Sequence, residues 1–193
     1  MKLKLLIILI LALPCKSYSQ LPSEANNFLY AKEFSKEIAL FNTKSFLFRD
    51  VLGISSDIVQ FEVIPLAASN SGELTTLLYR CESKNKEGLV LGFYGNYWNK
   101  FGAVYQGFSF KNLEKEKAIE FLNRIQSAMD DNEKFLFQEA DNNNIYFRYD
   151  DIDVLICYSY QNYIIRLFWN GFDSTWERTA FNRSKRRFER KMK

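Results

Sequence analysis

Three short stretches between residues 144 and 169 constrain the fold of this chain more than any other feature. In each stretch apolar side chains alternate with polar or mixed ones, which is the period of a β-strand with one buried face. Short turn-forming segments separate the stretches, and only Gln161 and Asn162 stand between the last two. Connections this short join antiparallel neighbours. The stretches NIYFRY, VLICYSY and YIIRLFW therefore predict an antiparallel meander.

The alternation also predicts which side of this meander is buried. One side collects the larger apolar set and should meet the helices. Its members are Ile145, Phe147, Tyr149, Val154, Ile156, Tyr158, Tyr160, Tyr163, Ile165, Leu167 and Trp169. The opposite side is mixed and could be partly covered or could be a binding surface. Arg148 and Arg166 share that side, where they would form a small anion-binding spot if they are neighbours, or would each pair with a carboxylate.

Turn-forming clusters divide an earlier part of the chain into four more β-like runs. These runs cover residues 58–67, 73–83, 88–95 and 103–110. An amphipathic pattern from about Leu113 to Met129 follows them and predicts a helix with one apolar side. Residues 23–43, which precede the first run, carry apolar residues at helical spacing and predict another helix.

The second set of β-like runs would repeat the first. It would add KFLFQ, residues 134–138, to the three stretches above and would end in a helix. Ser174 and Glu177 have the spacing of a capping box, so this helix should begin near Thr175. We therefore predict one α+β domain over residues 20–193, with an antiparallel sheet of seven or eight strands and three helices mainly on one side. The order of elements leaves open an internal duplication of a four-strand-plus-helix unit.

The first nineteen residues have the pattern of a secretory signal peptide. Two lysines precede nine apolar residues, 5–13, a run too short to cross a bilayer. Ser17 and Ser19 are small residues at the positions that a signal peptidase reads, which predicts cleavage after Ser19. Pro14 stands before Cys15 where a lipoprotein signal has a small residue, which argues against lipid attachment. We expect an exported protein, periplasmic or secreted, without a transmembrane segment in its mature part.

Removal of the signal peptide would change the charge balance. The full chain has 26 basic and 23 acidic residues, and the signal contains three lysines and no acid, so 23 of each would remain. A neutral chain has no overall attraction for nucleic acid, and no such partner is expected. Residues 178–193 nevertheless carry eight cations against one acid. They predict either a helix docked by its apolar stripe or a contact with anionic components of the cell envelope.

The chain contains no histidine. This removes Ser-His-acid and Cys-His nucleophile systems and histidine-based metal sites, and no glycine motif for phosphate or dinucleotide binding is present. The sequence therefore assigns no catalytic residue, metal or cofactor, and it argues against an enzyme without excluding one. Asp141, Asp150, Asp151 and Asp153 fall at hairpin ends, where they could be solvated turn residues or the carboxylates of a hydrolase acting on glycans.

Two cysteines, Cys81 and Cys157, would remain after cleavage. In an oxidising compartment they could form one disulfide, which would close a loop of about 77 residues and stabilise the fold by constraining the unfolded chain. Two buried thiols are the alternative.

Large aromatic residues surround the turn-forming sequence GNYWNKFG. The candidates are Tyr94, Tyr97, Trp98, Phe101 and Tyr105. Flat amphipathic rings at a turn suit stacking on sugar rings or anchoring a protein partner, whereas a loop that folds back would bury the same rings in the core. We predict a non-enzymatic binding or accessory protein that holds a protein partner or a glycan through this turn, with Arg148 and Arg166 as further candidates. The glycan hydrolase and an envelope-surface protein held by residues 178–193 are the alternatives.

Overall fold

The structure is a computed structural model that describes residues 40–53, 55–98, 101–102, 104–139 and 142–192. The predicted signal peptide, residues 1–19, lies outside the described residues, as does most of the helix predicted at residues 23–43. The last part of that segment is described: residues 40–46 are helical and continue into a π-helix, Leu47–Val51.

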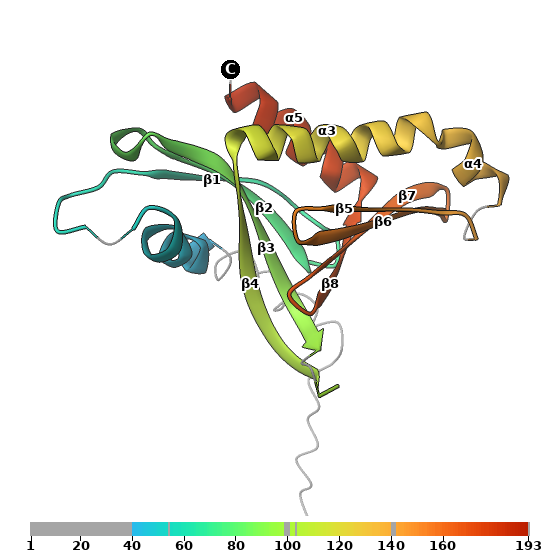
Figure 1. The fold of residues 1–193 in the computed structure, drawn as a ribbon, viewed down its shortest axis with the longest axis horizontal. Helices are drawn as coiled ribbons and strands as arrows, with labels where there is room; N and C mark the ends of the chain where they lie inside the picture. Colours follow the sequence, from blue (N-terminus) through green and yellow to red (C-terminus); the bar gives the residue numbers. More distant parts are fainter. Residues whose placement is uncertain (1–39, 54, 99–100, 103, 140–141, 193) are drawn as a thin grey trace, which may run out of the picture. The chain divides into compact units, whose positions relative to one another are not determined.

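The described residues form an eight-stranded antiparallel sheet, which confirms the predicted α+β class (Figure 1). The first meander consists of β1 (Glu62–Ala68), β2 (Leu74–Cys81), β3 (Lys86–Trp98) and β4 (Val104–Glu114). The second consists of β5 (Asn144–Tyr149), β6 (Ile152–Ser159), β7 (Asn162–Trp169) and β8 (Phe172–Glu177). Helices α3 (Lys115–Asp131) and α4 (Glu133–Gln138) follow the first meander, and α5 (Arg178–Lys191) follows the second. Each meander thus precedes a helix, in the order that the sequence predicts.

Residues 134–138 form helix α4, so the predicted strand is wrong. The run KFLFQ alternates like a strand, but in the helical conformation its apolar side chains Leu136 and Phe137 still pack against the rest of the fold. Leu136 is buried, and the Phe137 ring lies 4.2 Å from the Tyr158 ring between centroids. The Asn143 side-chain amide also donates to the Phe135 carbonyl at 2.6 Å. Contacts with the sheet therefore override the local pattern.

The last helix begins at Arg178 rather than near Thr175, because Ser174 and Glu177 belong to strand β8. Ser174 is buried opposite Leu167, and Trp176 is buried opposite Ile165. No side-chain cap is formed at the start of α5. The capping-box spacing is therefore coincidental, and the period of two in β8 decides the conformation.

The two meanders join where β3 changes its neighbour. On one side β3 pairs with β4, and on the other it pairs first with β2 and then with β8, giving the order β1-β2-β3-β8-β7-β6-β5. The Trp98 N–H donates to the Gly171 carbonyl at 3.0 Å. Gly171 has φ +81°, and a Cβ there would lie 2.6 Å from the Trp98 oxygen, so this junction requires glycine.

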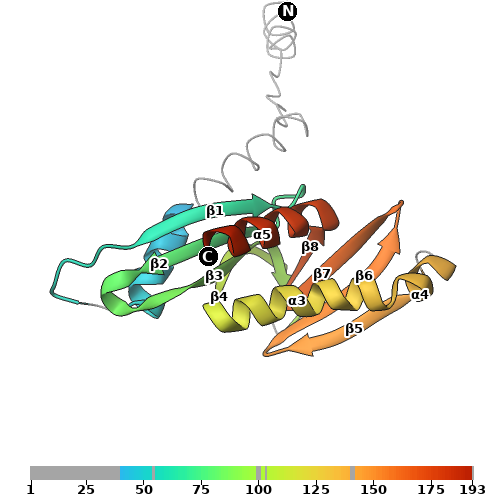
Figure 2. The same cartoon turned by 90° about the horizontal axis from the view of Figure 1, so that it is seen from above.

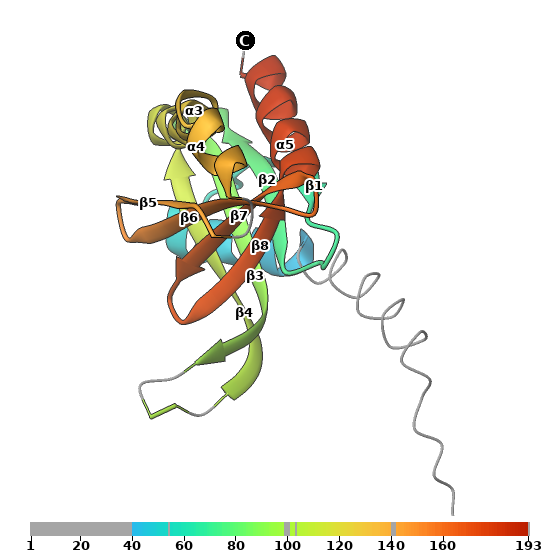
Figure 3. The same cartoon turned by 90° about the vertical axis from the view of Figure 1, so that its right-hand side faces the viewer.

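Helices α3, α4 and α5 lie on one side of the sheet (Figure 2, Figure 3). Helix α5 follows the second meander but packs on β1 as well as on β7 and β8. Its buried Phe181 and Phe188 enter one core cluster with residues of both meanders. The predicted inward side of the second meander belongs to this cluster, except for Tyr160, which is 94% exposed in a turn. The two halves therefore share a single core.

A second apolar cluster covers the opposite side of the first meander. Leu47, Val51 and Leu52 pack there with side chains of β2 and β3. The first meander is thus covered on both faces over β2 and the adjoining part of β3, but the far end of its β3–β4 hairpin is not covered on the outer face. The second meander exposes Tyr146, Arg148 and Phe168 on its outer face. No helix among the described residues is long and apolar enough to cross a bilayer.

Candidate functional site

The hairpin of β3 and β4 extends beyond the other strands (Figure 3). Its two strands pair without a register break from Gly88–Glu114 to Trp98–Val104. The turn-forming sequence GNYWNKFG is therefore strand as far as Trp98, and the turn itself is shorter than the sequence suggests. This geometry presents the end of the hairpin away from the shared core.

Strand alternation separates the predicted aromatic residues. Tyr97 lies on the inner face, partly buried, with its ring 5.3 Å from the Phe172 ring between centroids. Trp98 is 61% exposed on the outer face, and Phe101, at the turn, is 81% exposed. Tyr94 is partly buried on the outer face, and the side chain of Tyr105 lies outside the described part of the chain. Burial in the core thus explains Tyr97, but it does not explain Trp98 and Phe101.

Two residues that the sequence did not single out extend this surface. Val104 and Phe108, on β4, are 48% and 50% exposed. Val104 pairs with Trp98 across the strands, and Phe108 pairs with Tyr94. We call Trp98, Phe101, Val104 and Phe108 the hairpin patch. The signal that could have identified Val104 and Phe108 is strand alternation, which puts them on the same face as Trp98, beyond the point where the Phe46 ring of the helical segment stacks on Phe110 of β4.

The hairpin patch is electrically neutral. Residues 88–98 and 104–110 contain no charged side chain. On the outer face of this part of the hairpin, the polar groups are the side-chain amides of Asn96 and Gln106, which face each other across the strands, and the hydroxyl of Tyr94. An exposed apolar surface of this kind favours a partner that can bury it rather than a charged ligand.

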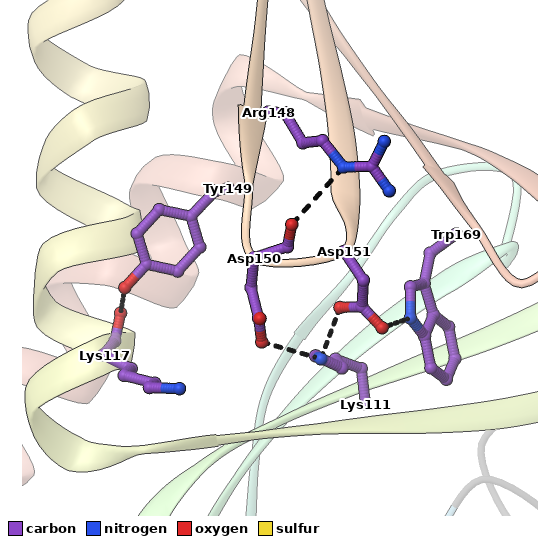
Figure 4. Close-up of polar contacts among 7 residues, drawn as sticks. All are labelled: Lys111, Lys117, Arg148, Tyr149, Asp150, Asp151 and Trp169. Atoms are coloured by element: carbon purple, nitrogen blue, oxygen red, sulfur yellow. Dashed lines mark hydrogen bonds and ion pairs between the residues drawn. The ribbon is translucent and has the colours of Figure 1, made fainter.

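Lys111, on the inner face of β4, forms a separate polar cluster with the β5–β6 turn (Figure 4). Its Nζ atom lies 3.0 Å from Asp150 Oδ2 and also donates to Asp151 Oδ1. The Trp169 indole N–H donates to Asp151 Oδ2 at 2.8 Å. The cluster ties the first meander to the second at the level of β4, β5 and β7. The sequence singles out Asp150 and Asp151, but it does not identify Lys111 or Trp169 as their partners.

The electrostatics of this cluster favour its charged form. Burial alone would lower the pKa of Lys111, but its hydrogen bonds to Asp151 and Asp150 outweigh burial and raise that pKa. Burial alone would likewise raise the pKa of Asp151, but the bonds from Lys111 and Trp169 hold it below its ordinary value. The raised pKa keeps Lys111 protonated at neutral pH, where a lysine is a poor base or nucleophile, and the contacts of this cluster join β4 to the β5–β6 turn.

Tyr149 makes a second fastening next to this cluster (Figure 4). Its hydroxyl donates to the Lys117 carbonyl at 3.0 Å and lies 3.1 Å from Glu120 Oε2, which joins β5 to α3. Burial, followed by the hydrogen bond to the Glu120 carboxylate, raises the pKa of Tyr149 to about 12.

Replacing Lys111 by methionine should lower the free energy of unfolding by about 1 kcal/mol, because both carboxylates are half-exposed and screened. Urea denaturation at low salt measures this loss, which should shrink at about 1 M salt. It should also disappear as the pH falls through the lowered pKa of Asp151, where the carboxylate loses its charge. Lys185→Met, which removes a lysine paired with Glu189 inside α5, is the control and should cost less. An equal loss in both variants would show that Lys111 does not join the meanders.

The two arginines of the outer face are each paired with a carboxylate. Arg166 Nε donates to Asp173 Oδ1 at 3.0 Å, and Arg148 Nε lies 3.8 Å from Asp153 Oδ1. This is the arrangement of the second sequence interpretation, in which each arginine pairs with a carboxylate. They stand on the second meander, outside the hairpin patch.

The described members of the predicted acidic set, Asp150, Asp151 and Asp153, are each engaged in a polar contact. Asp150 and Asp151 bind Lys111, and Asp153 accepts from the Tyr146 hydroxyl at 2.7 Å. Glycoside hydrolysis needs an acid with a raised pKa, whereas that of Asp151 is lowered. Asp141 lies outside the described residues. In the part of the chain that the structure describes, no three Asp, Glu, Cys or His side chains are grouped to hold a metal ion.

The two cysteines lie in different parts of the sheet and are not joined in a disulfide. Cys81 ends β2, buried in the second apolar cluster, with its Sγ 3.5 Å from Ser83 Oγ. Cys157 lies in β6, opposite Ile164 on the partly exposed outer face.

The basic helix α5 is docked through an apolar stripe. Ala180, Ser184 and Phe188 are buried, and Ser184 Oγ lies 2.7 Å from Thr76 Oγ1 of β2. Several cations of this segment serve the fold: Arg187 donates to the Leu66 carbonyl, and the Arg178 guanidinium lies 4.7 Å from the centre of the Tyr163 ring. This supports the interpretation of a packed terminal helix.

No protein-family model, curated protein or solved structure matches this chain.

Proposed function

We propose that this chain is an exported, non-enzymatic binding protein that holds a protein partner through the hairpin patch. The exposure of Trp98 and Phe101 carries the proposal, because both are large apolar side chains at the end of a hairpin that extends beyond the other strands. Export is expected from the pattern of residues 1–19. Aromatic residues at the centre of a surface patch are the usual anchors of protein interfaces.

A protein partner fits this surface better than a glycan does. Phe101, Val104 and Phe108 have hydrocarbon side chains, which cannot hydrogen-bond to sugar hydroxyls. Burial of such side chains gains most free energy against another apolar surface. The amides of Asn96 and Gln106 between them can bind either backbone groups or hydroxyls, so they do not change this preference.

The absence of histidine and the state of the described polar clusters support a binding function rather than catalysis. Lys111 and Asp151 are each held in the charged form, because, despite burial, their hydrogen bond raises the pKa of the lysine and lowers that of the carboxyl. A binding protein requires no titrating group in its site.

The test places a photo-crosslinking amino acid at position 101 of the protein in the cells that produce it. We expect a covalent complex with another protein. A crosslinker at position 104 of the otherwise unaltered chain should capture the same protein. The double variant Trp98→Thr with Phe101→Ser, carrying the crosslinker at position 104, should lose that capture while its unfolding free energy changes by less than about 0.5 kcal/mol. Ile58→Ser removes a side chain that is 95% exposed outside the patch, and this control should leave the complex intact. A complex that survives the double variant, or one that a glycan displaces, would contradict the proposal.

A further inference from the structure

Three strands form edges of the sheet among the described residues. Strands β1 and β5 end its path, and β4 pairs only with β3. An edge strand presents unpaired backbone N–H and C=O groups that can pair with another chain, and folded proteins usually block such edges with proline, charges, bulges or short strands.

Strands β1 and β5 carry these protections. In β1, Pro65 has no N–H, the register shifts between Pro65 and Ala67, and Arg187 occupies the Leu66 carbonyl. Strand β5 is six residues long and carries Arg148 on its exposed face. Each of these edges is therefore a poor template for an added strand.

Strand β4 is eleven residues long and has none of these protections over residues 104–110. The hydrogen bonds of β3 show which backbone groups of β4 point outward. Tyr94 N–H donates to Glu73 O at 2.8 Å, and Trp98 N–H donates to Gly171 O at 3.0 Å, so both residues direct their backbone away from β4. In an antiparallel ladder their partners on β4 also direct their backbone groups away from β3. The outward groups therefore belong to Phe108, Val104 and, between them, Gln106.

The same three residues present their side chains on the outer face, because side-chain and backbone directions alternate together along a strand. None of them is charged. A strand added at this edge would meet free backbone groups and apolar side chains at once.

We propose that the occupant of this edge is a second copy of the chain, paired antiparallel, β4 to β4, about Gln106. A two-fold axis at Gln106 sets Gln106 against its copy and Val104 against Phe108 of the second copy. Each exposed apolar side chain of the edge then meets another one. Other registers match the side chains less well. An axis shifted by one residue sets the polar Gln106 against the apolar Val104 or Phe108, and an axis at residue 109 sets Val104 against the charged Glu114. The arrangement is isologous, as closed dimers require.

This register also continues the apolar surface across four strands. Trp98 lies beside Val104, Val104 would lie beside Phe108 of the second copy, and that residue lies beside Tyr94 of its own β3. The symmetry repeats this row in the opposite direction. Aromatic and aliphatic neighbours across strands stabilise a sheet, and no like charges face each other at these positions.

The inference deepens the proposed function and rests on it in one respect, since both take the exposed side chains of the hairpin as an interaction surface. They fail separately. A monomeric chain that still forms the crosslinked complex removes the second copy and keeps the binding function. A dimer whose position 101 captures no other protein keeps the second copy and removes the heterologous partner.

Sedimentation of the purified protein over a dilution series tests the dimer. The unaltered chain should sediment at twice the chain mass, and Gln106→Pro should sediment as a monomer, because proline removes the outward N–H of the central pair while the β3–β4 ladder does not use that group. Gln106→Thr keeps the N–H and should stay dimeric. A monomer for the unaltered chain, or a dimer that Gln106→Pro leaves unchanged, overturns the proposal.

Oxidation of Gln106→Cys tests the register and does not depend on the folding of the proline variant. Directly opposed residues have Cα atoms about 5.5 Å apart, within the range of a disulfide. The covalent dimer should therefore form. Phe108→Cys is the control, because its two copies would lie about 14 Å apart and should not join. The unaltered chain, which contains Cys81 and Cys157, sets the background. Joining at position 108 but not at 106 contradicts the register.

Discussion

Replacing Phe188 by alanine should lower the free energy of unfolding by about 3–5 kcal/mol. The Phe188 side chain is fully buried and shares the core cluster with Leu66 of β1 and Leu78 of β2. Truncation would remove the contacts of a large ring and leave a cavity between α5 and the first meander. Chemical denaturation followed by circular dichroism measures the loss, and the whole described sheet should unfold in one transition because the two meanders share this core.

The matched control for Phe188 is Phe168→Ala on the outer face of β7. Phe168 is 36% exposed, so the same change there should cost less than about 1.5 kcal/mol. Equal losses at the two positions would mean that α5 is not anchored in the core. Two separate transitions in the unaltered protein would contradict the shared core itself.

Raising the pH from 10 to 12 should destabilise the protein steeply. Burial raises the pKa of Tyr79 from 10.0 to about 12, although its bond to Asn112 acts in the opposite direction, and the pKa of Tyr149 is also about 12. A folded-state pKa above the unfolded value means that the stabilisation is complete below pH 10 and is lost as the pH rises through the folded pKa. For Tyr79, which is 1% exposed, the shift corresponds to a loss of about 2–3 kcal/mol.

Denaturation at a series of pH values, with Tyr79→Phe beside the unaltered chain, measures this effect. The variant should lose less stability between pH 10 and 12, because phenylalanine has no proton to release. Tyr160→Phe, at a position that is 94% exposed, should follow the unaltered curve. Since the chain has no histidine, no imidazole contributes a comparable change between pH 5 and 8. Identical curves for Tyr79→Phe and the unaltered chain would contradict the assignment.

The second meander was predictable because its strands alternate strictly and its connections are short. Residues on the side predicted to face the helices, such as Val154, Ile156 and Ile165, are fully buried as expected. Residues 134–138 and 174–177 were assigned wrongly because each matches two local patterns, and contacts with the rest of the sheet decide between them. Local sequence cannot supply that decision.

The candidate site was predictable only in part, for the same reason. The aromatic turn could be recognised from composition, but whether a ring is buried depends on parity within β3, which puts Tyr97 against Phe172 and leaves Trp98 exposed. The pairing of β3 with β8 and the contacts of Lys111 join positions far apart in the chain. These contacts form only when one meander packs against the other, so the sequence of a single strand does not predict them.

The cover on both faces of β2 and of the inner part of β3 bears on the binding function proposed for the hairpin. Strand β2 is buried over nearly its whole length, and β3 is buried from Gly88 to Phe93 before it leaves the core. The exposed end of the β3–β4 hairpin is therefore continuous with strands whose backbone amides should exchange hydrogen most slowly. A hairpin held rigidly at its base loses little conformational entropy when it binds. More of the interaction free energy therefore contributes to affinity.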